Sequence, residues 1–219
     1  MEIKNLKREI KQSISPDDYR ILKQALMQMC RDKTNPSSMR TARMHCLYFE
    51  NSLEQPGEKR VEKFIIRYQG EDKDSIRLEK KSRKRELLLE RSACISGLDC
   101  EMILAGDLDS LSAAEDPLLF EFYGGLKSHK LKPKLLVDST KETFVLGASA
   151  CVSMESDFST GLNVSDFLNE KHPTIARTGQ ILLEVQYEKY LPEIVSRLLA
   201  GPKGFKPAQL LPAHALNRI

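Results

Sequence analysis

Residues 61–82, VEKFIIRYQGEDKDSIRLEKKS, predict two antiparallel strands joined by a short turn at residues 70–74. Apolar and charged residues alternate on both sides of this turn, and successive side chains of a strand point to opposite faces. One face of the hairpin is therefore mainly apolar, and the other carries a charge at almost every second position. The charged face is predicted to hold Lys63, Arg67, Arg77, Glu79 and Lys81.

Further strands and helices are expected on both sides of this hairpin. Helices are expected where a capping residue or a proline precedes a helical pattern. Ser15 and Ser96 are predicted N-caps, and Pro117 and Pro192 are predicted to begin two more helices. Strands are expected over the N-terminal residues that end near Ser13, and over residues 43–50, 87–89, 132–144, 150–158 and 180–187.

These elements predict an α+β fold class, with many antiparallel strands and peripheral helices in a single domain over residues 1–200. The remaining residues, 201–219, are rich in Pro, Gly and Ala, and we expect a loosely ordered or docked tail. The composition, 41% hydrophobic and 30% charged, is that of a globular protein and argues against disorder.

Charge and composition narrow the function classes only slightly. The net charge of +3 is too small to predict a polyanionic partner. No stretch approaches the roughly 20 apolar residues of a membrane helix, and residues 1–5 lack the apolar core of a signal peptide. We therefore expect a cytoplasmic protein without a membrane span. The five cysteines form no CxxC pair and the four histidines lack metal-ligand spacing, so a His/Cys metal site is not expected.

Charged residues also alternate on two other predicted strands, at Glu9 and Lys11 and at Glu184 followed by Gln186. Two interpretations remain open. A solvated face of an antiparallel sheet is the more common origin of such a pattern. The alternative is a barrel with an ionic interior, which requires a compensating ion or polyanion because unpaired buried charge is costly.

Two basic segments were considered as binding motifs. The run KKSRKR at residues 80–85 is compatible with nucleic-acid binding, but it lacks the interleaved aromatic residues that stack on bases. A solvated hairpin tip is the simpler interpretation, so no DNA partner is expected. The segment GPKGFK at residues 201–206 lacks the spacing of a phosphate-binding P-loop.

Several segments, in the right order, resemble the VTC-type polyphosphate polymerases. Glu9 and Lys11 match the Glu-x-Lys signature of that family's first strand. Later segments resemble the family's motifs SLYFD, FRIRY, VDYTRE and LEVKY, and here they read CLYFE at 46–50, FIIRY at 64–68, VDSTKE at 137–142 and LEVQY at 183–187. The resemblance runs from about Leu6 to Leu199. It implies a triphosphate-tunnel barrel, an antiparallel β-tunnel whose lumen is lined by basic residues and a few acids.

The resemblance also implies a function, a cofactor and a set of site residues. Members of the family transfer the terminal phosphate of ATP to a growing polyphosphate chain with Mn²⁺ or Mg²⁺. The implied partners are therefore ATP or another triphosphate, and polyphosphate. Glu184 matches the metal-binding glutamate, with Glu9 as a second acid. The implied phosphate-binding residues are Lys11, Arg67, Arg77, Lys81 and Lys141.

The sequence departs from the family pattern at several basic positions. Ile65 and Cys151 stand where the family has Arg, and Gln186 stands where it has Lys. Glu90 falls at another expected Lys, although the neighbouring Arg91 leaves the register open by one residue. Pro212-Ala213 replaces a Ser-Lys pair. Each lost charge-assisted phosphate contact is worth about 1.5–3 kcal/mol.

These losses leave three functions open, and whether the chain is an enzyme stays open with them. The first is a polyphosphate polymerase of reduced activity. The second is a non-catalytic descendant that binds polyphosphate, a nucleotide or a protein. The third is a triphosphate hydrolase of the same fold, in which acids such as Glu9, Glu79 and Glu90 would bind additional metal.

Overall fold

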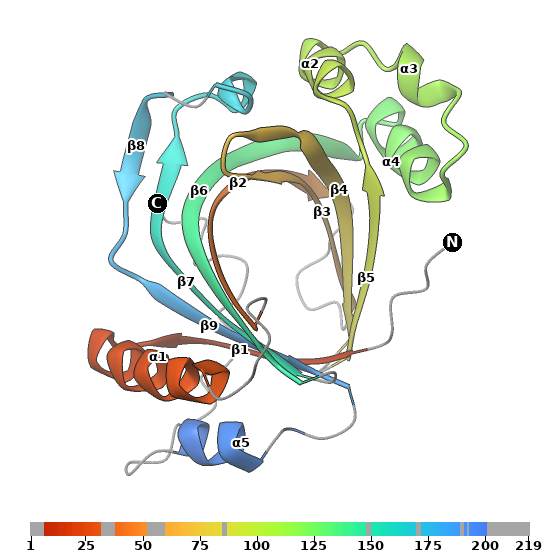
Figure 1. Ribbon diagram of the computed structural model, residues 1–219. Helices are drawn as coiled ribbons and strands as arrows, with labels where there is room; N and C mark the ends of the chain where they lie inside the picture. Colours follow the sequence, from red (N-terminus) through yellow and green to blue (C-terminus); the bar gives the residue numbers. More distant parts are fainter. Residues whose placement is uncertain are drawn as a thin grey trace. The chain divides into compact units, whose positions relative to one another are not determined.

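The computed structural model describes residues 7–31, 38–51, 60–84, 87–147, 150–169, 172–188, 191 and 193–200 (Figure 1). The expected tail at 201–219 and the motif departure at Pro212-Ala213 lie outside the described residues. The helices are α1 (Pro16–Arg31), α2 (Gly97–Ala105), α3 (Asp109–Ser112), α4 (Pro117–Lys127) and α5 (Glu193–Ala200), with a short 3₁₀ turn at Val164–Asp166. The strands are β1 (Lys7–Ile14), β2 (Met39–Asn51), β3 (Arg60–Gln69), β4 (Asp72–Lys84), β5 (Leu87–Cys94), β6 (Leu131–Leu146), β7 (Ala150–Gly161), β8 (Thr174–Arg177) and β9 (Ile181–Tyr187).

The described strands form one sheet in the order β6-β2-β3-β4-β5-β1-β9-β7-β8, and a further pairing joins β6 to β7. The eight strands from β6 to β7 in this order therefore form a closed barrel. The ninth strand, β8, is added to it through its pairing with β7. The β3–β4, β4–β5, β1–β9 and β7–β9 pairs are all antiparallel. The α+β fold class with an antiparallel barrel and peripheral helices is confirmed.

The chain divides into two compact units, each described by itself. Unit 1 comprises residues 1–6, 43–139 and 159–177, and unit 2 comprises residues 7–42, 140–158 and 178–219. Neither the 1–200 domain boundary nor the tail is tested by this division, so both stay predictions. Within the described residues, no helix combines the length and the apolar character that crossing a membrane requires.

Unit 1 contains the hairpins β2–β3, β3–β4 and β4–β5 and the helices α2, α3 and α4, which gather beside β5 (Figure 1). The β3–β4 turn places Gly70 at a φ of +59°, which glycine adopts without a steric penalty. The apolar residues Phe64, Ile66 and Tyr68 pack in one core with Phe122 of α4, whose ring lies 5.5 Å from that of Phe64. One face of the β3–β4 hairpin therefore packs against the helices.

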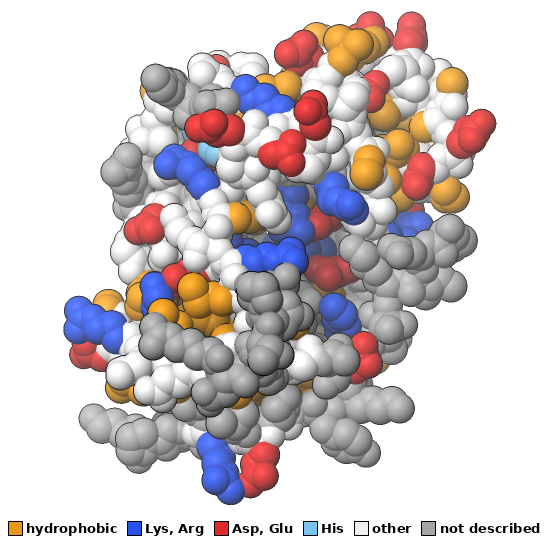
Figure 2. All heavy atoms as spheres, in the orientation of Figure 1, with side chains coloured by type: hydrophobic (Ala, Val, Ile, Leu, Met, Phe, Trp, Pro, Cys, Tyr) orange, Lys and Arg blue, Asp and Glu red, His pale blue; other side chains and the backbone are white. Residues whose placement is uncertain are grey.

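The helices α2 and α4 of unit 1 begin where the sequence predicts. Ser96 caps α2 by accepting a hydrogen bond from the backbone N–H of Asp99 at 3.0 Å. The Asp116 side chain caps α4, which has Pro117 in its first turn. Leu98 and Phe120 of these helices are exposed, and Figure 2 shows hydrophobic side chains on the surface of this region.

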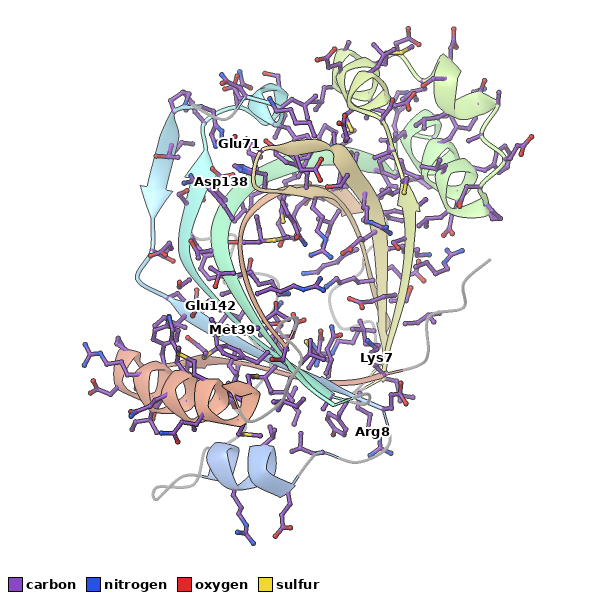
Figure 3. The ribbon with its side chains drawn as sticks, viewed as in Figure 1. Lys7, Arg8, Met39, Glu71, Asp138 and Glu142 are labelled. Atoms are coloured by element: carbon purple, nitrogen blue, oxygen red, sulfur yellow. The ribbon has the colours of Figure 1, made fainter. Side chains whose placement is uncertain are left out.

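Unit 2 contains β1, β9, most of β7 and the second half of β6, with α1 and α5. Ser15 caps α1 by accepting a hydrogen bond from the backbone N–H of Asp18 at 3.1 Å. The helix α1 packs Leu22 and Leu26 in one core with Leu183 of β9. It is also bonded to β6, where Glu142 (Figure 3) accepts a 2.6 Å hydrogen bond from the Tyr19 hydroxyl. One face of this sheet is therefore covered by helices, and the other is left for polar side chains.

Candidate functional site

The charged face predicted for residues 61–82 exists in unit 1, opposite the apolar core. The register of β3, β4 and β5 sets three rows of residues across this face. Alternate residues of the same strands, such as Phe64, Ile66 and Leu78, point into the core. We call the opposite side the charged face of unit 1, and its rows are Lys63–Lys81–Glu90, Ile65–Glu79–Ser92 and Arg67–Arg77–Cys94.

Cations on this face are paired with carboxylates. Arg67 lies 2.6 Å from Oε1 of Glu79, and Nζ of Lys81 lies 2.9 Å from Oε1 of Glu90. Glu79 is 8% exposed, and the side chains of Arg67 and Lys81 are about one quarter exposed. Burial by itself would lower the pKa of Arg67, but the Glu79 carboxylate, together with Cys46 and Glu90, raises that pKa above its ordinary value. The solvated-face interpretation therefore fails for these residues.

Arg77 differs from the other predicted cations of unit 1. It belongs to the same face, but its side chain is exposed and donates a 3.4 Å hydrogen bond to the hydroxyl of Ser92. Because this exposed guanidinium has a weak, neutral hydrogen-bond partner, it loses little interaction energy when it contacts an anion.

The open register at residues 90 and 91 is settled by the strand pairing. Glu90 lies opposite Lys81 on the charged face, whereas Arg91 points to the other face and bonds to Glu121 of α4. Lys80 also belongs to that other face, 2.6 Å from Glu121, and is only 6% exposed. Glu90, and not the neighbouring Arg91, therefore stands on the charged face of unit 1. Lys80, the first lysine of the basic run at 80–85, therefore stabilises the fold through its ion pair with Glu121. Residues 85 and 86 lie outside the described residues.

A second charged face lies in unit 2, again opposite the apolar core. The register of β1, β9 and β7 places Lys11, Glu184 and Ser153 in one row and Glu9, Gln186 and Cys151 in the next. Both glutamates are buried, with Glu184 7% exposed and Glu9 6% exposed. We call these six residues, together with Lys141 of β6, the charged face of unit 2.

Glu184 is the centre of this second face. Its carboxylate lies 3.4 Å from Nζ of Lys11 and 3.7 Å from Nζ of Lys141. It also accepts a 3.0 Å hydrogen bond from the side-chain amide of Gln186. Two predicted phosphate ligands thus share one carboxylate, the one to which the resemblance assigns the metal.

Cys151 lies on this face, opposite Gln186 of β9. Burial raises the pKa of its thiol, and hydrogen bonding to Ser153 and the charge of Lys141 only partly oppose this effect. A thiol with a raised pKa is neutral at pH 7 and offers no positive charge to a phosphate.

One cluster, centred on Asp138, was not predicted from the sequence. This residue of β6 (Figure 3) is 2% exposed and lies 2.8 Å from Nδ1 of His45. It also lies 3.1 Å from Nε2 of His172, without an aligned hydrogen bond between the two atoms. Arg43 approaches its other side at 3.5 Å. The stacking of His45 on Tyr68 places this cluster on the core side of unit 1.

A model of the VTC domain family matches residues 6–205 of the chain. The chain belongs to the VTC domain family. Because the match covers most of the sequence, the resemblance to this family is confirmed.

Solved structures agree with this VTC assignment at the level of the fold. The Hippeastrum protein HpAC1, described as having a dominant triphosphatase activity, is 14% identical with a TM-score of 0.54, over 90% of this chain and 85% of that one. The mimivirus capping-enzyme triphosphatase is 8% identical, with a TM-score of 0.46 over 90% and 87% of the two chains. A conserved hypothetical protein of Pyrococcus furiosus is 14% identical, with a TM-score of 0.46 over 93% and 97%.

The first of these matches shows that the VTC domain has the triphosphate-tunnel fold expected from its sequence. The other two matches have lower scores and carry no further argument. A search of curated proteins finds no significant relative.

The VTC domain's acids were tested as ligands for the Mn²⁺ or Mg²⁺ that the family implies. Among the described residues, no three His, Cys, Asp or Glu side chains converge as a metal site. Magnesium is commonly held by one or two carboxylates together with the phosphates of a substrate, rather than by a cage of protein ligands. Glu184, with Glu9 in the neighbouring row, fits this second mode of binding.

Proposed function

We propose that this VTC domain binds the phosphate chains of ATP and polyphosphate and transfers the terminal phosphate of ATP to the polymer at a low rate. The observation that carries the proposal is the pairing of largely buried cations and carboxylates on a face opposite each apolar core. Such faces suit a ligand that is itself a string of negative charges. Family membership supplies the choice of a phosphate chain.

The roles follow from the contacts of each cation. Lys11 and Lys141 would exchange their shared carboxylate for phosphate oxygens, and Arg67 and Lys81 would do the same on the charged face of unit 1. Exposed Arg77 would add a contact that requires no broken ion pair. Phosphoryl transfer needs alignment and charge neutralisation more than covalent catalysis, so cations held in fixed rows are suitable groups.

Glu184, with Glu9 as a second carboxylate, would hold a divalent cation, which would supply positive charge against the charge that develops on the phosphates. The protein residues have the separate task of holding the two phosphate chains in line. Gln186 keeps the Glu184 carboxylate oriented through its 3.0 Å hydrogen bond.

The expected rate is low because four family cations are replaced on these faces. Ile65, which is 6% exposed, and neutral Cys151 provide no charge. The side-chain amide of Gln186 donates a hydrogen bond to Glu184, and Glu90 forms an ion pair with Lys81. At about 1.5–3 kcal/mol for each lost contact, these changes lower transition-state stabilisation substantially.

Triphosphate hydrolysis is the second candidate function. It is favoured by Glu79 and Glu90, which lie on the same face as Arg67 and Lys81 and could bind additional metal. The terminal phosphate would then be transferred to water and not to the end of a polymer.

Incubation with ATP and Mn²⁺, followed by separate assays for polyphosphate and for free phosphate, tests the proposal. Polyphosphate supports it, whereas free phosphate alone replaces it with hydrolysis. If neither product forms but tripolyphosphate binds measurably, the protein binds phosphate chains without catalysing their transfer. We place this activity in the cytoplasm, where ATP is available, and none of the five cysteines forms a disulfide.

A further inference from the structure

Charge is distributed unevenly along the chain, and one segment carries only acids. Residues 92–126 contain seven Asp and Glu residues and no Lys, Arg or His, although Lys and Arg outnumber the acids in the whole chain by 34 to 31. This segment includes α2, α3 and all of α4 except its last residue, and these helices pack on the core side of the unit 1 sheet. Their outer surface is therefore separate from the charged face of unit 1.

Four of the seven acids are exposed on these helices and their connections. The other three act within the fold, because Glu121 forms ion pairs with β4 and β5 and the side chains of Asp99 and Asp116 cap α2 and α4. The exposed acids are Glu101, Asp107, Asp109 and Glu115. Like charges gathered on one surface attract basic groups and repel phosphates.

Large apolar side chains are exposed on the same helices. Leu98 of α2 is 66% exposed, and Phe120 of α4 is 58% exposed. The ring of Phe120 lies 6.2 Å from that of Tyr123, one turn further along α4. Figure 2 shows hydrophobic and acidic side chains interspersed over this region, at the upper right of the view. We call Leu98, Phe120 and the four exposed acids the acidic helical surface of unit 1.

We propose that the acidic helical surface of unit 1 binds a basic amphipathic helix of a partner protein. Charge complementarity selects this partner, because its Lys and Arg side chains would pair with the exposed acids while its apolar side chains cover Leu98 and Phe120. A cation of the partner can also lie over the ring of Phe120, as Nζ of Lys127 lies 5.2 Å from the centre of the Tyr123 ring.

Other classes of partner fit this surface less well. Nucleic acids and anionic membranes present phosphates, which the exposed acids repel. A partner that adds a strand requires an open sheet edge, whereas this surface is formed by helices and their connections. An amphipathic helix needs only an apolar surface with charges of the opposite sign around it. The proposal is independent of the proposed function, since it concerns different residues.

Fluorescence anisotropy with a labelled synthetic helix tests the proposal on the full chain. The probe has about 18 residues, or five turns, with Leu on one face and Lys on the other, and the control peptide has Glu in place of every Lys. The wild type should bind the Lys peptide saturably, less tightly as salt is added, and should not bind the Glu peptide. Phe120→Ser should weaken binding at least about fivefold, and Ile175→Ser, at a 63% exposed residue of β8, is the matched control.

A second pair of variants tests the charge. Glu101→Lys combined with Glu115→Lys should weaken binding of the Lys peptide at least as much as Phe120→Ser does. Glu71→Lys combined with Asp74→Lys makes the same charge change at exposed residues near the β3–β4 turn and should leave binding unchanged. If Phe120→Ser does not fold, as judged by circular dichroism, the charge variants decide alone.

Several outcomes would overturn the proposal. These are no binding of the Lys peptide by the wild type, equal binding of the two peptides, or equal losses in test and control variants. Binding to neutral phosphatidylcholine vesicles that Phe120→Ser abolishes would assign the surface to lipid instead. A dimer in sedimentation that Phe120→Ser dissociates would assign it to a second copy of the chain. Tripolyphosphate binding should be the same in Phe120→Ser and the wild type, so that failure here leaves the proposed function standing.

Discussion

The carboxylate of Asp138 lies 2.8 Å from Nδ1 of His45, and both side chains are almost completely buried. This contact joins β6 to β2, and His172 extends it to the segment between β7 and β8. Nδ1 of His172 donates to the backbone carbonyl of Asn169 at 2.8 Å. The cluster therefore fixes three separate parts of unit 1 on the core side of its sheet, and we assign it to stability.

Replacing Asp138 should destabilise the fold strongly. Asp138→Ala removes the hydrogen-bond partner of buried His45 and the carboxylate beside buried His172, and breaking a buried ionic contact on one side typically costs about 3–5 kcal/mol. Denaturant unfolding measures this loss. Asp74→Ala, at an exposed position near the start of β4, is the matched control, and its effect should stay within about 0.5 kcal/mol. Equal effects of the two substitutions would contradict the assignment.

The same cluster predicts a pH dependence. Burial would raise the pKa of Asp138, but the His45 hydrogen bond and the charges of His45, His172 and Arg43 lower it below its ordinary value. A depressed pKa in the folded state adds stability above the unfolded pKa of about 3.9, and that stability is lost as the pH falls through the folded pKa. The stability difference between wild type and Asp138→Asn should therefore shrink below about pH 4. A difference that stays constant down to pH 2 would exclude this linkage.

Lys81 provides a test of phosphate binding in unit 1. Lys81→Gln removes the charge without setting a new glutamate against Glu90, so the fold should be retained. Tripolyphosphate at low salt should raise the melting temperature of the wild type, because it binds only the folded state, and the shift should shrink with added salt. In Lys81→Gln the shift should be much smaller. Lys132→Gln, at an exposed lysine of β6, is the control and should keep the full shift.

Glu90 should be a position where affinity can be gained. Glu90→Lys replaces an anion by the cation that the family motif carries and releases Lys81 for the ligand. Tripolyphosphate affinity should rise about tenfold, which corresponds to one charge-assisted contact of about 1.5 kcal/mol. The melting temperature without ligand should fall, because Lys81 then faces a like charge. Glu101→Lys on α2 makes the same charge change away from the face, and an equal gain there would refute a local effect.

Much of this architecture was predictable because its signals are local. The alternation in residues 61–82 assigned each side chain to a face, and the register of β3 and β4 confirms those assignments. Capping by Ser15 and Ser96 was also predicted correctly, since a cap acts within three residues. The short elements α3 and β8, with four residues each, carry no periodic pattern and were not predicted.

The remaining features depend on contacts between distant residues. Asp138 is 93 residues from His45, so spacing could not reveal their contact. The sequence could not decide which of the adjacent residues Glu90 and Arg91 is on the charged face. The ion pair between Arg91 and Glu121 of α4 shows that Arg91 is on the opposite face. The pairing of Lys11 and Lys141 with Glu184 likewise follows from strand order. The sequence predicted these three residues individually, but it did not show that they share one carboxylate.

The central claim is that the paired cations bind a phosphate chain. The most direct measurement is calorimetric titration of inorganic tripolyphosphate, with Mg²⁺ at low salt, into the wild type and into a variant with Lys11, Arg67, Lys81 and Lys141 all changed to Gln. We expect saturable wild-type binding that weakens as salt is added. We expect no binding by the variant, provided that circular dichroism shows a folded protein. Undetectable binding by the wild type, or equal binding by both proteins, would contradict it.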